Sequence, residues 1–297
     1  MHSQPCDRLV HQGYQFFSPD STAAVKPCLW CKASLVGNGM CYKHQFYGID
    51  SHRCVQMTPT LRCTQRCLFC WRSFEHQVTE EAECPPEEIL RLIPDLQKRA
   101  LSGYKVSPKV PPERFREALS PRHVAISLSG EPTLYSSLPR LVDLLSENGF
   151  STFLVSNGTH PEVLEKCHPF QQYVSLCAPD EETYLRLCRP VADFWGAIQE
   201  SLSLLAKKRS AVRITLVQGW NDRNPEKYGR MIQNASPWFV EVKGYMYLGY
   251  SRKRLRRENM PEYHHVFQFA REIAACSGYQ ILDENPNSRV VLLGRPS

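Results

Sequence analysis

The stretch that decides the fold is Cys63-Thr-Gln-Arg-Cys67-Leu-Phe-Cys70, a short loop that contains three cysteines. Three thiolates at this spacing can ligate three irons of a cubane iron-sulfur cluster and leave the fourth iron open for chemistry. A closed zinc site would need a fourth cysteine or a histidine close by, and a zinc knuckle would pair Cys67-x-x-Cys70 with a second such pair. The loop itself supplies neither, so its spacing favours an iron-sulfur cluster over zinc.

This loop resembles the CxxxCxΦC loop of the radical S-adenosylmethionine (SAM) superfamily, in which Phe69 would be the aromatic residue before the last cysteine. The resemblance implies that Cys63, Cys67 and Cys70 hold a 4Fe-4S cluster whose open iron is chelated by the amino and carboxylate groups of SAM. It also implies that the reduced cluster cleaves SAM to a 5′-deoxyadenosyl radical. In such enzymes the cofactor carries the demanding chemistry, while the protein supplies position and excludes water.

Composition favours a soluble enzyme of ordinary globular class. The chain has 297 residues, 13 cysteines and a formal net charge of +6, which only mildly favours an acidic partner. The N-terminal residues contain no apolar signal segment, so we expect a cytoplasmic protein with reduced thiols and metal ligation rather than disulfides. No apolar run approaches the roughly 18 to 20 residues that a membrane span requires, so we expect no membrane association.

Six short apolar stretches alternate with amphipathic helical patterns, which predicts repeated βα units and a parallel sheet. The expected strands are Val55–Thr60, His123–Leu128, Thr152–Val155, Tyr173–Leu176, Val212–Val217 and Phe239–Val242. The helical patterns include Leu138–Leu145, Tyr184–Leu187, Phe194–Leu205 and Tyr263–Ala274. A right-handed series of such units curls into a barrel with its functional loops at the carboxyl ends of the strands. We therefore predict an α/β fold, a partial (βα)6 TIM-like barrel of the radical SAM type with an N-terminal cysteine-rich extension.

Further candidate SAM contacts follow the other expected strands. Ser129-Gly-Glu-Pro-Thr-Leu134 comes after the second strand and resembles the glycine-rich segment that approaches the methionine amino group. The resemblance places further cofactor contacts on side chains at and beyond the next three strands. The cofactor-binding candidates are Phe69, Gly130, Glu131, Pro132, Thr133, Asn157, Ser175 and Thr215. The simpler interpretation is that Asn157 forms a turn with Gly158, and that Ser175 and Thr215 are ordinary strand residues.

A second series of cysteines, Cys28, Cys41 and Cys54, precedes the loop with equal gaps of thirteen residues. These cysteines, together with several short phrases, resemble the 4-demethylwyosine synthase family, archaeal-type tRNA enzymes with a second 4Fe-4S cluster near the N-terminus. The resemblance runs from about Val25 to about Pro261. The supporting phrases are Phe46-Tyr-Gly-Ile49, His52-Arg-Cys-Val-Gln-Met-Thr-Pro59, Cys70-Trp-Arg72, Val242-Lys-Gly-Tyr-Met-Tyr247 and Glu258-Asn-Met-Pro261.

One departure from the family pattern is Cys31, which forms a CxxC pair with Cys28. Either thiol can be the first ligand. Cys28 is favoured because it preserves the gap of thirteen, and a free cysteine commonly behaves as a small apolar residue. The alternative is a zinc site with four thiolates, from Cys28, Cys31, Cys41 and Cys54. The remaining cysteines lack a metal-ligand grouping and are expected to be buried or incidental, namely Cys6, Cys84, Cys167, Cys177, Cys188 and Cys276.

Lys43 is the candidate catalytic residue. Most lysines are solvated, but a lysine held near a cationic or apolar site can lose its proton and form a Schiff base with a carbonyl. In the family that carbonyl belongs to pyruvate, and the matching lysine follows the middle cysteine of the second cluster. Lys43 has that position, two residues after Cys41.

The resemblance implies a complete reaction on N1-methylguanosine next to the anticodon (position 37) of tRNA-Phe. The radical removes hydrogen from the N1-methyl group, and the methylene radical attacks C2 of pyruvate. Cleavage between C1 and C2 then releases the carboxyl group, and condensation with the guanine amino group gives 4-demethylwyosine. No flavodoxin-like module precedes the core, so we expect an external electron donor protein, and we expect a monomer.

A basic segment, Gly249-Tyr-Ser-Arg-Lys-Arg-Leu-Arg-Arg257, follows the sixth strand and is the candidate tRNA surface. A charge run is usually a solvated face, but here it lies among tyrosines and at the same expected rim as the cluster loop. Phosphate contacts of this kind make binding fall steeply with salt. The RNA-binding candidates are Tyr250, Arg252, Lys253, Arg254, Arg256 and Arg257.

The expected domains are an N-terminal extension with the second cluster's ligands (1–54), the radical SAM core (55–260) and a C-terminal extension (261–297). The apolar run Val290–Leu293 can either cover the barrel or complete its sheet. Two other functions stay open, a radical SAM enzyme with another substrate and a non-enzymatic, zinc-stabilised RNA-binding protein. The sequence leaves undecided the electron donor, the oligomeric state, the tRNA contacts, and whether Lys43 or the second cluster holds pyruvate.

Overall fold

The computed structural model describes residues 4–74 and 82–295, which fold as two compact units. The N-terminal unit contains Met1–Arg62, His76–Val155 and Lys166–Phe170. The C-terminal unit contains Cys63–Glu75, Ser156–Glu165 and Gln171–Ser297. None of the helices in the described ranges is long and apolar enough to cross a membrane.

In the N-terminal unit, neighbouring strands follow the order β1-β2-β3-β4-β5. The two pairs that involve β2 are antiparallel, whereas β3 and β4, and β4 and β5, run parallel. The strands are β1 (Gln15–Phe16), β2 (Ala24–Val25), β3 (Cys54–Thr58), β4 (His123–Ile126) and β5 (Ser151–Ser156). The helices are α1 (Gln4–His11), α2 (Leu29–Leu35), α3 (Tyr42–Tyr47), α4 (Pro86–Ala100), α5 (Pro112–Ala118) and α6 (Leu138–Glu147), with single 3-10 turns η1 (Ser51–Arg53), η2 (Ser102–Tyr104) and η3 (Pro132–Leu134).

The long helices of this unit bury one apolar stripe each. In α4 the buried side chains include Ile89, Ile93 and Leu96, which recur at three and four positions and face α6. Both helices have a proline in their first turn, where a missing backbone N–H costs nothing. Helix α4 also contacts β1 and β2, and core residues of the parallel strands, such as Val124 and Phe153, are fully buried.

In the C-terminal unit, neighbouring strands follow the order β6-β7-β8-β10-β9. The pairs among β6, β7 and β8 are parallel, and β10 is antiparallel to both β8 and β9. The strands are β6 (Gln171–Ser175), β7 (Ser210–Leu216), β8 (Phe239–Gly244), β9 (Gln280–Asn285) and β10 (Val290–Gly294). The helices are α7 (Pro161–Glu165), α8 (Glu181–Cys188), α9 (Trp195–Ser203), α10 (Pro225–Ala235) and α11 (Tyr263–Ser277), with 3-10 turns η4 (Leu204–Lys207), η5 (Gly249–Lys253), η6 (Arg257–Asn259) and η7 (Pro286–Ser288).

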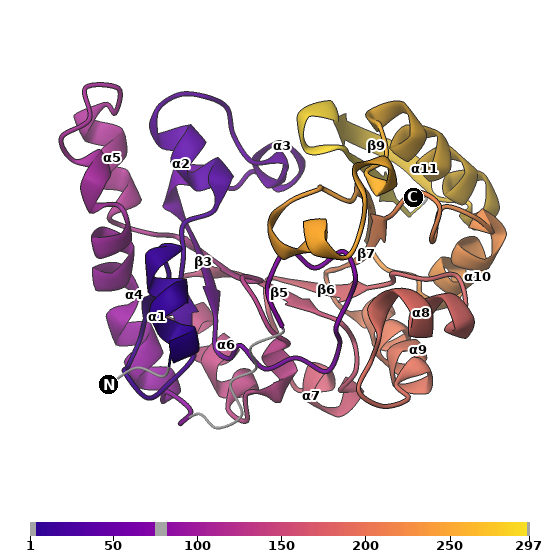
Figure 1. Ribbon diagram of the computed structural model, residues 1–297, viewed down its shortest axis with the longest axis horizontal. Coiled ribbons are helices and arrows are strands. Elements are labelled where there is room, and N and C mark those ends of the chain that lie inside the picture. Colours follow the sequence, from indigo (N-terminus) through magenta and orange to yellow (C-terminus); the bar gives the residue numbers. More distant parts are fainter. Residues whose placement is uncertain (1–3, 75–81, 296–297) are drawn as a thin grey trace. The chain divides into compact units, whose positions relative to one another are not determined.

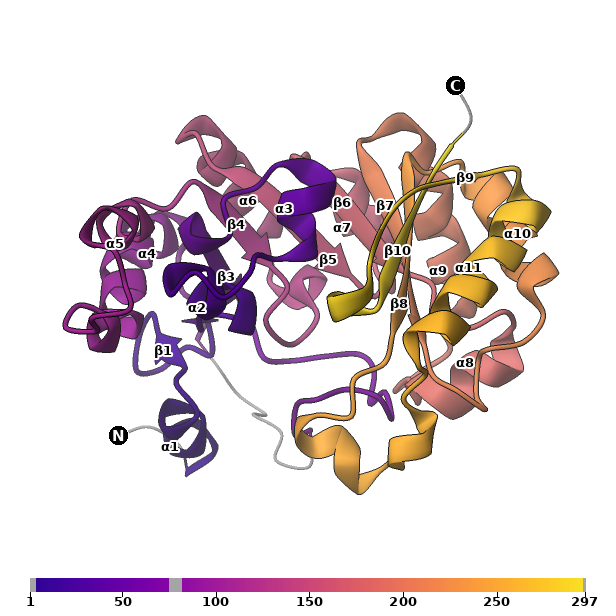
Figure 2. The same ribbon diagram turned by 90° about the horizontal axis from the view of Figure 1, so that it is seen from above.

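Helices α10 and α11 lie side by side in Figures 1 and 2. Their close approach depends on Gly229, because a Cβ built at that position would lie 2.6 Å from the Cβ of Cys276. Any other residue would push the two helices apart. This contact brings Val266, Phe269 and Ile273 of α11 into the buried core of the unit.

All six expected strands are present, as β3 to β8, and each lies within two residues of its predicted bounds. The predicted helical stretches correspond to α6, α8, α9 with η4, and α11. The apolar run Val290–Leu293, whose place the sequence left open, becomes β10 and extends the sheet beside β8.

Candidate active site

The cluster loop belongs to the C-terminal unit, and its backbone is held by the end of α8. The Arg66 N–H donates to the carbonyl of Cys188 at 3.0 Å, and the Leu68 N–H donates to that of Leu187 at 2.9 Å. Further along, the Val191 N–H donates to the Thr64 carbonyl at 2.9 Å. Cys67 therefore lies on a backbone that is fixed on both sides by hydrogen bonds.

Asn157 is the predicted cofactor contact that the structure brings to this loop. Its Nδ2 donates to Thr64 Oγ1 at 2.9 Å and lies 3.9 Å from the sulfur of Cys63. Its Oδ1 accepts hydrogen bonds from the N–H and hydroxyl of Thr159, at 3.1 and 2.9 Å. Asn157 thus orients the start of the loop and directs an N–H toward a candidate ligand sulfur, a type of contact that tunes iron-sulfur clusters.

Cys188 adds a contact to Cys67 that the sequence did not predict. Its buried thiol hydrogen-bonds both Cys177 and Cys67, and these contacts, with burial, raise the pKa of Cys188. The sequence predicted that Cys177 and Cys188 are buried or incidental; Cys188 is buried, and the structure adds that the two thiols form a chain that ends at a candidate ligand. Cys84 and Cys167 are buried as expected, and Cys276 is exposed. The side chain of Cys6 lies outside the described residues.

Phe69 packs into an apolar cluster of the C-terminal unit. Leu68, Leu187, Val217, Tyr245 and Leu255 form its buried centre, and Phe69 packs against it with Trp220, Tyr247 and Met260. The cluster joins the cysteine loop to the loop after β7 and to the basic segment 249–257. A cofactor that contacts the ring of Phe69 would therefore meet a side chain already fixed by packing.

The basic segment is fastened to the backbone that follows the cluster loop. The Tyr250 N–H donates to the Trp71 carbonyl at 2.8 Å. A Cβ at Gly249, whose φ is +56°, would lie 2.3 Å from that same oxygen, so only glycine permits the approach. Four of the six RNA-binding candidates have exposed side chains, namely Arg252, Lys253, Arg256 and Arg257. Tyr250 is partly exposed, and Arg254 instead donates to the carbonyls of Cys70 and Arg72.

Ser175 and Thr215 lie on one polar face of the sheet in the C-terminal unit. Ser175 is the register partner of Arg213, and Thr215 is the partner of Lys243. On the same face Glu241 is fully buried and accepts from Arg213 at 2.8 Å and from the Tyr173 hydroxyl at 3.0 Å. The alternate positions of these strands, such as Val212 and Val240, are buried and apolar. The sequence analysis did not predict the Arg213–Glu241 pair. The signal that could have indicated it is the occurrence of polar residues at every second position of a buried strand.

The second series of cysteines lies in the N-terminal unit, at the starts of three elements. Cys28 is the N-cap of α2, Cys41 is the N-cap of α3, and Cys54 is the first residue of β3. Burial raises the pKa of the Cys54 thiol, the thiols of Cys28, Cys31 and Cys41 raise it further, and the Lys43 ammonium lowers it. Cys54 is therefore within electrostatic reach of the other three thiols and of Lys43, and the Cys41 N–H donates to Ser51 Oγ at 2.9 Å, in the turn just before Cys54.

Cys28 and Cys31 occupy different surroundings. Cys31 is fully buried in an apolar cluster with Leu35, Leu101, Val110 and Ala118, and burial raises its pKa to about 12. The sulfur of Cys28 is partly exposed and accepts the Cys31 N–H at 3.3 Å. Packing of Cys31 with apolar neighbours agrees with the behaviour of a small apolar residue.

Lys43 is buried in α3, with 8 % of its surface exposed. Its Nζ lies 4.6 Å from the centre of the Phe153 ring, and Tyr47 packs on the same ring. Burial removes water from the amine, and the face of the Phe153 ring limits the directions in which the side chain can point. The geometry suits an amine held for reaction with a carbonyl.

The Gly130 segment follows β4 in the N-terminal unit and is tied to the backbone beyond β3. Gly130 has a φ of +73°, and a Cβ there would lie 2.2 Å from the Thr60 carbonyl oxygen. The Glu131 N–H donates to the Arg62 carbonyl at 2.7 Å, and its buried carboxylate accepts from the N–H and hydroxyl of Thr133. Pro132 and Thr133 form the start of η3. Glycine is thus required here for backbone contact within the protein, whatever ligand the segment meets.

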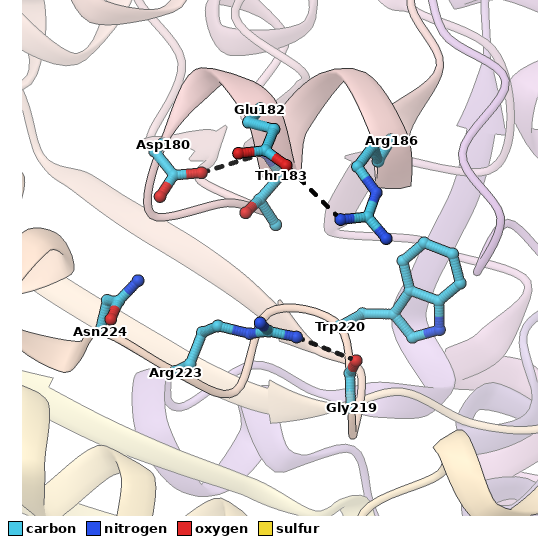
Figure 3. A pocket seen from close by; sticks show the side chains of 8 residues that line it. All are labelled: Asp180, Glu182, Thr183, Arg186, Gly219, Trp220, Arg223 and Asn224. Carbon is cyan, nitrogen blue, oxygen red and sulfur yellow. Dashed lines mark hydrogen bonds and ion pairs between the residues drawn. The ribbon is translucent and has the colours of Figure 1, made fainter.

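A separate cavity of about 160 Å³ lies in the C-terminal unit, between α8 and the loop after β7. Figure 3 shows Arg186 and Glu182 on one wall and Arg223 with Trp220 on the other. Its charges are largely paired, since Glu182 lies 3.6 Å from Arg186 and Asp180 lies 2.7 Å from Lys227. None of its lining residues was predicted for the site, and it offers no group for redox or carbonyl chemistry.

Comparison with known proteins identifies the family. The radical SAM superfamily model matches residues 57–232, and the model described as wyosine base formation matches residues 234–295. The S-adenosyl-L-methionine-dependent tRNA 4-demethylwyosine synthase of Pyrococcus abyssi is 46% identical over 92% of this chain and 84% of its own length. That of Methanocaldococcus jannaschii is 41% identical over 96% of this chain and 94% of its own length.

The chain belongs to the tRNA 4-demethylwyosine synthase family. A solved structure of TYW1 with a lysine-pyruvate adduct bound is 38% identical, covers 99% of this chain and 96% of its own, and superposes with a TM-score of 0.91. The predicted fold class is therefore confirmed as that of the radical SAM enzymes. Membership implies an enzyme that uses SAM and a 4Fe-4S cluster.

The residues of the C-terminal unit fit such a cluster. Cys63 faces an amide donor from Asn157, and beside Cys70 the Nε and Nη1 of Arg254 are buried without a hydrogen-bond partner among the described residues. Buried unpaired donors are expected beside an anionic group. Within residues 4–74 and 82–295 no three histidine, cysteine or acidic side chains converge on a single metal ion. Cubane ligands bind different irons and need not converge on one point.

Proposed function

We propose that this protein condenses pyruvate with N1-methylguanosine at position 37 of tRNA-Phe and so forms 4-demethylwyosine. The observation that carries the proposal is Lys43, a buried lysine two residues after Cys41 and within electrostatic reach of Cys54. A relative whose solved structure covers 99% of this chain holds a lysine-pyruvate adduct. We assign that role in this chain to Lys43.

In the proposed reaction the Lys43 amine attacks C2 of pyruvate, and the carbonyl oxygen leaves as water to give a Schiff base. The reaction requires a neutral amine, and a lysine held in an apolar site can lose its proton. The ring of Phe153, 4.6 Å from Nζ, restricts the side chain to a small range of directions. The three proposed ligands Cys28, Cys41 and Cys54 would hold the second 4Fe-4S cluster beside the same amine.

We assign the first 4Fe-4S cluster to Cys63, Cys67 and Cys70. When bound, this cluster and SAM supply the radical that removes hydrogen from the N1-methyl group. Asn157 orients the loop, and the polar face with Ser175 and Thr215 offers hydroxyl groups for the cofactor. The other proposed SAM contacts are Phe69, Gly130, Glu131, Pro132 and Thr133. We retain the division into an extension (1–54), a core (55–260) and a C-terminal extension (261–297) as part of the proposal.

We propose that tRNA binds the exposed cations of the basic segment, with Tyr250 beside them. Arg252, Lys253, Arg256 and Arg257 are exposed, as phosphate contacts require. The enzyme would act as a monomer in the cytoplasm and receive its electron from another protein. The cysteines for which a bonding state is described are free thiols, which suits a reducing compartment.

The decisive experiment is an anaerobic reaction of the reconstituted protein with dithionite, SAM, pyruvate and tRNA-Phe that carries N1-methylguanosine. We expect a tricyclic nucleoside by mass after digestion of the RNA. Formation of 5′-deoxyadenosine without the tricycle would support a radical SAM enzyme with another substrate. A colourless protein with stoichiometric zinc and no 5′-deoxyadenosine would instead support a zinc-stabilised RNA-binding protein.

Lys43 is tested by reductive trapping of labelled pyruvate with cyanoborohydride. We expect label on Lys43, and a loss of at least about a hundredfold in tricycle formation by Lys43→Ala, with 5′-deoxyadenosine still formed. Lys26→Ala is the matched control, because Lys26 is also partly buried in the N-terminal unit and lies 4.7 Å from the Tyr14 ring. Label that persists in Lys43→Ala would assign the adduct to another lysine.

A further inference from the structure

Arg254 differs from the other cations of the basic segment in what its side chain contacts. Its Nη2 donates to the carbonyls of Cys70 and Arg72, the latter at 3.0 Å, and its guanidinium lies 4.0 Å from the centre of the Phe74 ring. Its Nε and Nη1 are buried and have no hydrogen-bond partner among the described residues. Arg252, Arg256 and Arg257, by contrast, are exposed.

The position of Arg254 is fixed by the segment around it. Gly249 and Tyr250 both contact the Trp71 carbonyl, and Leu255 is buried in the apolar cluster that includes Leu68. Anchors on both sides therefore hold the guanidinium against the backbone of Cys70. A surface side chain that only binds RNA needs no such support.

A buried cation with unused N–H donors is costly unless a negative charge lies nearby. The residue that Arg254 contacts, Cys70, is a proposed ligand of the 4Fe-4S cluster, which becomes more negative when it accepts an electron. A fixed positive charge stabilises the reduced state more than the oxidised state. The charge, hydrogen bonding and burial around a cluster are the features by which a protein sets its potential.

We propose that Arg254 is a positioning residue whose fixed charge raises the reduction potential of the cluster held by Cys63, Cys67 and Cys70. The inference rests on the proposed ligand set of that cluster and is independent of the tRNA and of pyruvate. One basic segment would then contain two kinds of cation, outward ones for RNA and an inward one for electron transfer to the cluster.

The test is an anaerobic redox titration of the reconstituted protein, followed by electron paramagnetic resonance without tRNA or pyruvate. The signal that changes on addition of SAM is assigned to the cluster with the open iron. For Arg254→Gln we expect a more negative midpoint, with the reduced-to-oxidised ratio at a fixed potential about tenfold lower, which equals about 59 mV for one electron. Arg254→Lys retains the charge and should restore most of the ratio.

Arg257→Gln is the matched control, since it removes the same charge from an exposed position three residues away. It should leave the midpoint unchanged, although the proposed function predicts weaker tRNA binding. An unchanged midpoint in Arg254→Gln, or an equal shift in Arg257→Gln, would overturn the proposal. If Arg254→Gln fails to retain iron, Arg254→Lys decides the matter, because a tenfold shift despite a retained charge contradicts an electrostatic role.

A competing role for the buried donors of Arg254 is direct binding of the SAM carboxylate. In that case Arg254→Gln would weaken SAM binding and leave the midpoint of the SAM-free cluster unchanged, which would overturn the proposal. Failure of the proposed function has a different outcome, in which the wild-type cluster cleaves SAM but no tricyclic nucleoside forms. The two failures are therefore distinguishable.

Discussion

The two groups of cysteines are built in different ways. Cys63, Cys67 and Cys70 lie on one loop, whose backbone is held by the end of α8. Cys28, Cys41 and Cys54 lie at the starts of α2, α3 and β3, so they could come together only in the folded N-terminal unit. A ligand set on one loop depends mainly on local spacing, whereas a dispersed set depends on tertiary structure. The difference predicts that the two groups respond differently to substitution.

The largest effect is expected from Cys67→Ala. Loss of a ligand to the SAM-binding cluster should lower 5′-deoxyadenosine formation by at least about a thousandfold. Cys276→Ala, at an exposed position in α11, is the control and should form 5′-deoxyadenosine normally. Both are measured by chromatography of a single-turnover reaction with dithionite. Normal formation of 5′-deoxyadenosine by Cys67→Ala would show that this loop does not bind the SAM-cleaving cluster.

Cys54→Ala separates the two groups. We expect the iron content to fall by about half, because one of the two proposed clusters would be lost, while 5′-deoxyadenosine is still formed. Cys31→Ala should retain full iron content if Cys28 is the ligand and Cys31 is only a packed apolar residue. Iron analysis with visible spectra measures both. Loss of half the iron from Cys31→Ala would mean that Cys31, and not Cys28, is the first ligand of the second cluster.

Gly130→Ala tests how strictly the N-terminal unit depends on backbone contact. A Cβ at a φ of +73° and 2.2 Å from the Thr60 carbonyl should cost about 2–4 kcal/mol in the free energy of unfolding. Gly103→Ala is the control, because its φ is ordinary and no atom lies within 4 Å of the added Cβ. Urea denaturation of the apo protein measures both. Equal stability of the two variants would contradict the close contact.

The smallest effect concerns the support of the cluster loop by α8. Asp180, the N-cap of α8, accepts a hydrogen bond from Lys227, and this contact lowers the pKa of its carboxyl group to about 2. A lowered pKa means that the carboxylate stabilises the folded state above the unfolded value near 4, and that this contribution disappears as pH falls toward 2. Since 31% of the side chain is exposed, we reduce the expected cost of Asp180→Asn at pH 7 to about 1 kcal/mol.

The Asn side chain retains an acceptor for the Thr183 N–H, so the variant isolates the charge. Urea denaturation at pH 7 and again between pH 4 and 2 measures the difference, which should shrink as the pH falls. Glu182→Gln is the control, because the Glu182 side chain is 83% exposed and its pair with Arg186 is screened by water. A difference that grows toward acid pH would contradict the proposed role of the Asp180–Lys227 pair.

Much of the fold was predictable because its determinants are local. The six strands were recognised from short apolar runs bounded by turns, and β3 to β8 lie where those runs lie. The cluster loop was recognised from three cysteines at a fixed spacing, which family membership supports. The candidate Lys43 came from its place after Cys41, and its burial is compatible with that hypothesis without testing it.

Other features depended on contacts between residues that are distant in sequence. The Cys188 thiol reaches Cys67, Glu241 is buried against Arg213 and Tyr173, and Arg254 contacts the carbonyl of Cys70. No local pattern distinguishes Arg254 from its basic neighbours, because the direction of a side chain is set by the packing of the segment around it. Sequence periodicity reports which face of a strand or helix is buried, but not which residue lies opposite.

The sequence by itself determined the order of strands and helices, the radical SAM class and the three-cysteine loop, since each depends on residues a few positions apart. Only the tertiary structure decided that Cys31 belongs to an apolar core, that Arg254 turns inward, and that Lys43 is buried within electrostatic reach of Cys54. The physical reason is that burial and the pairing of buried polar groups are properties of the packed chain, established when distant segments meet.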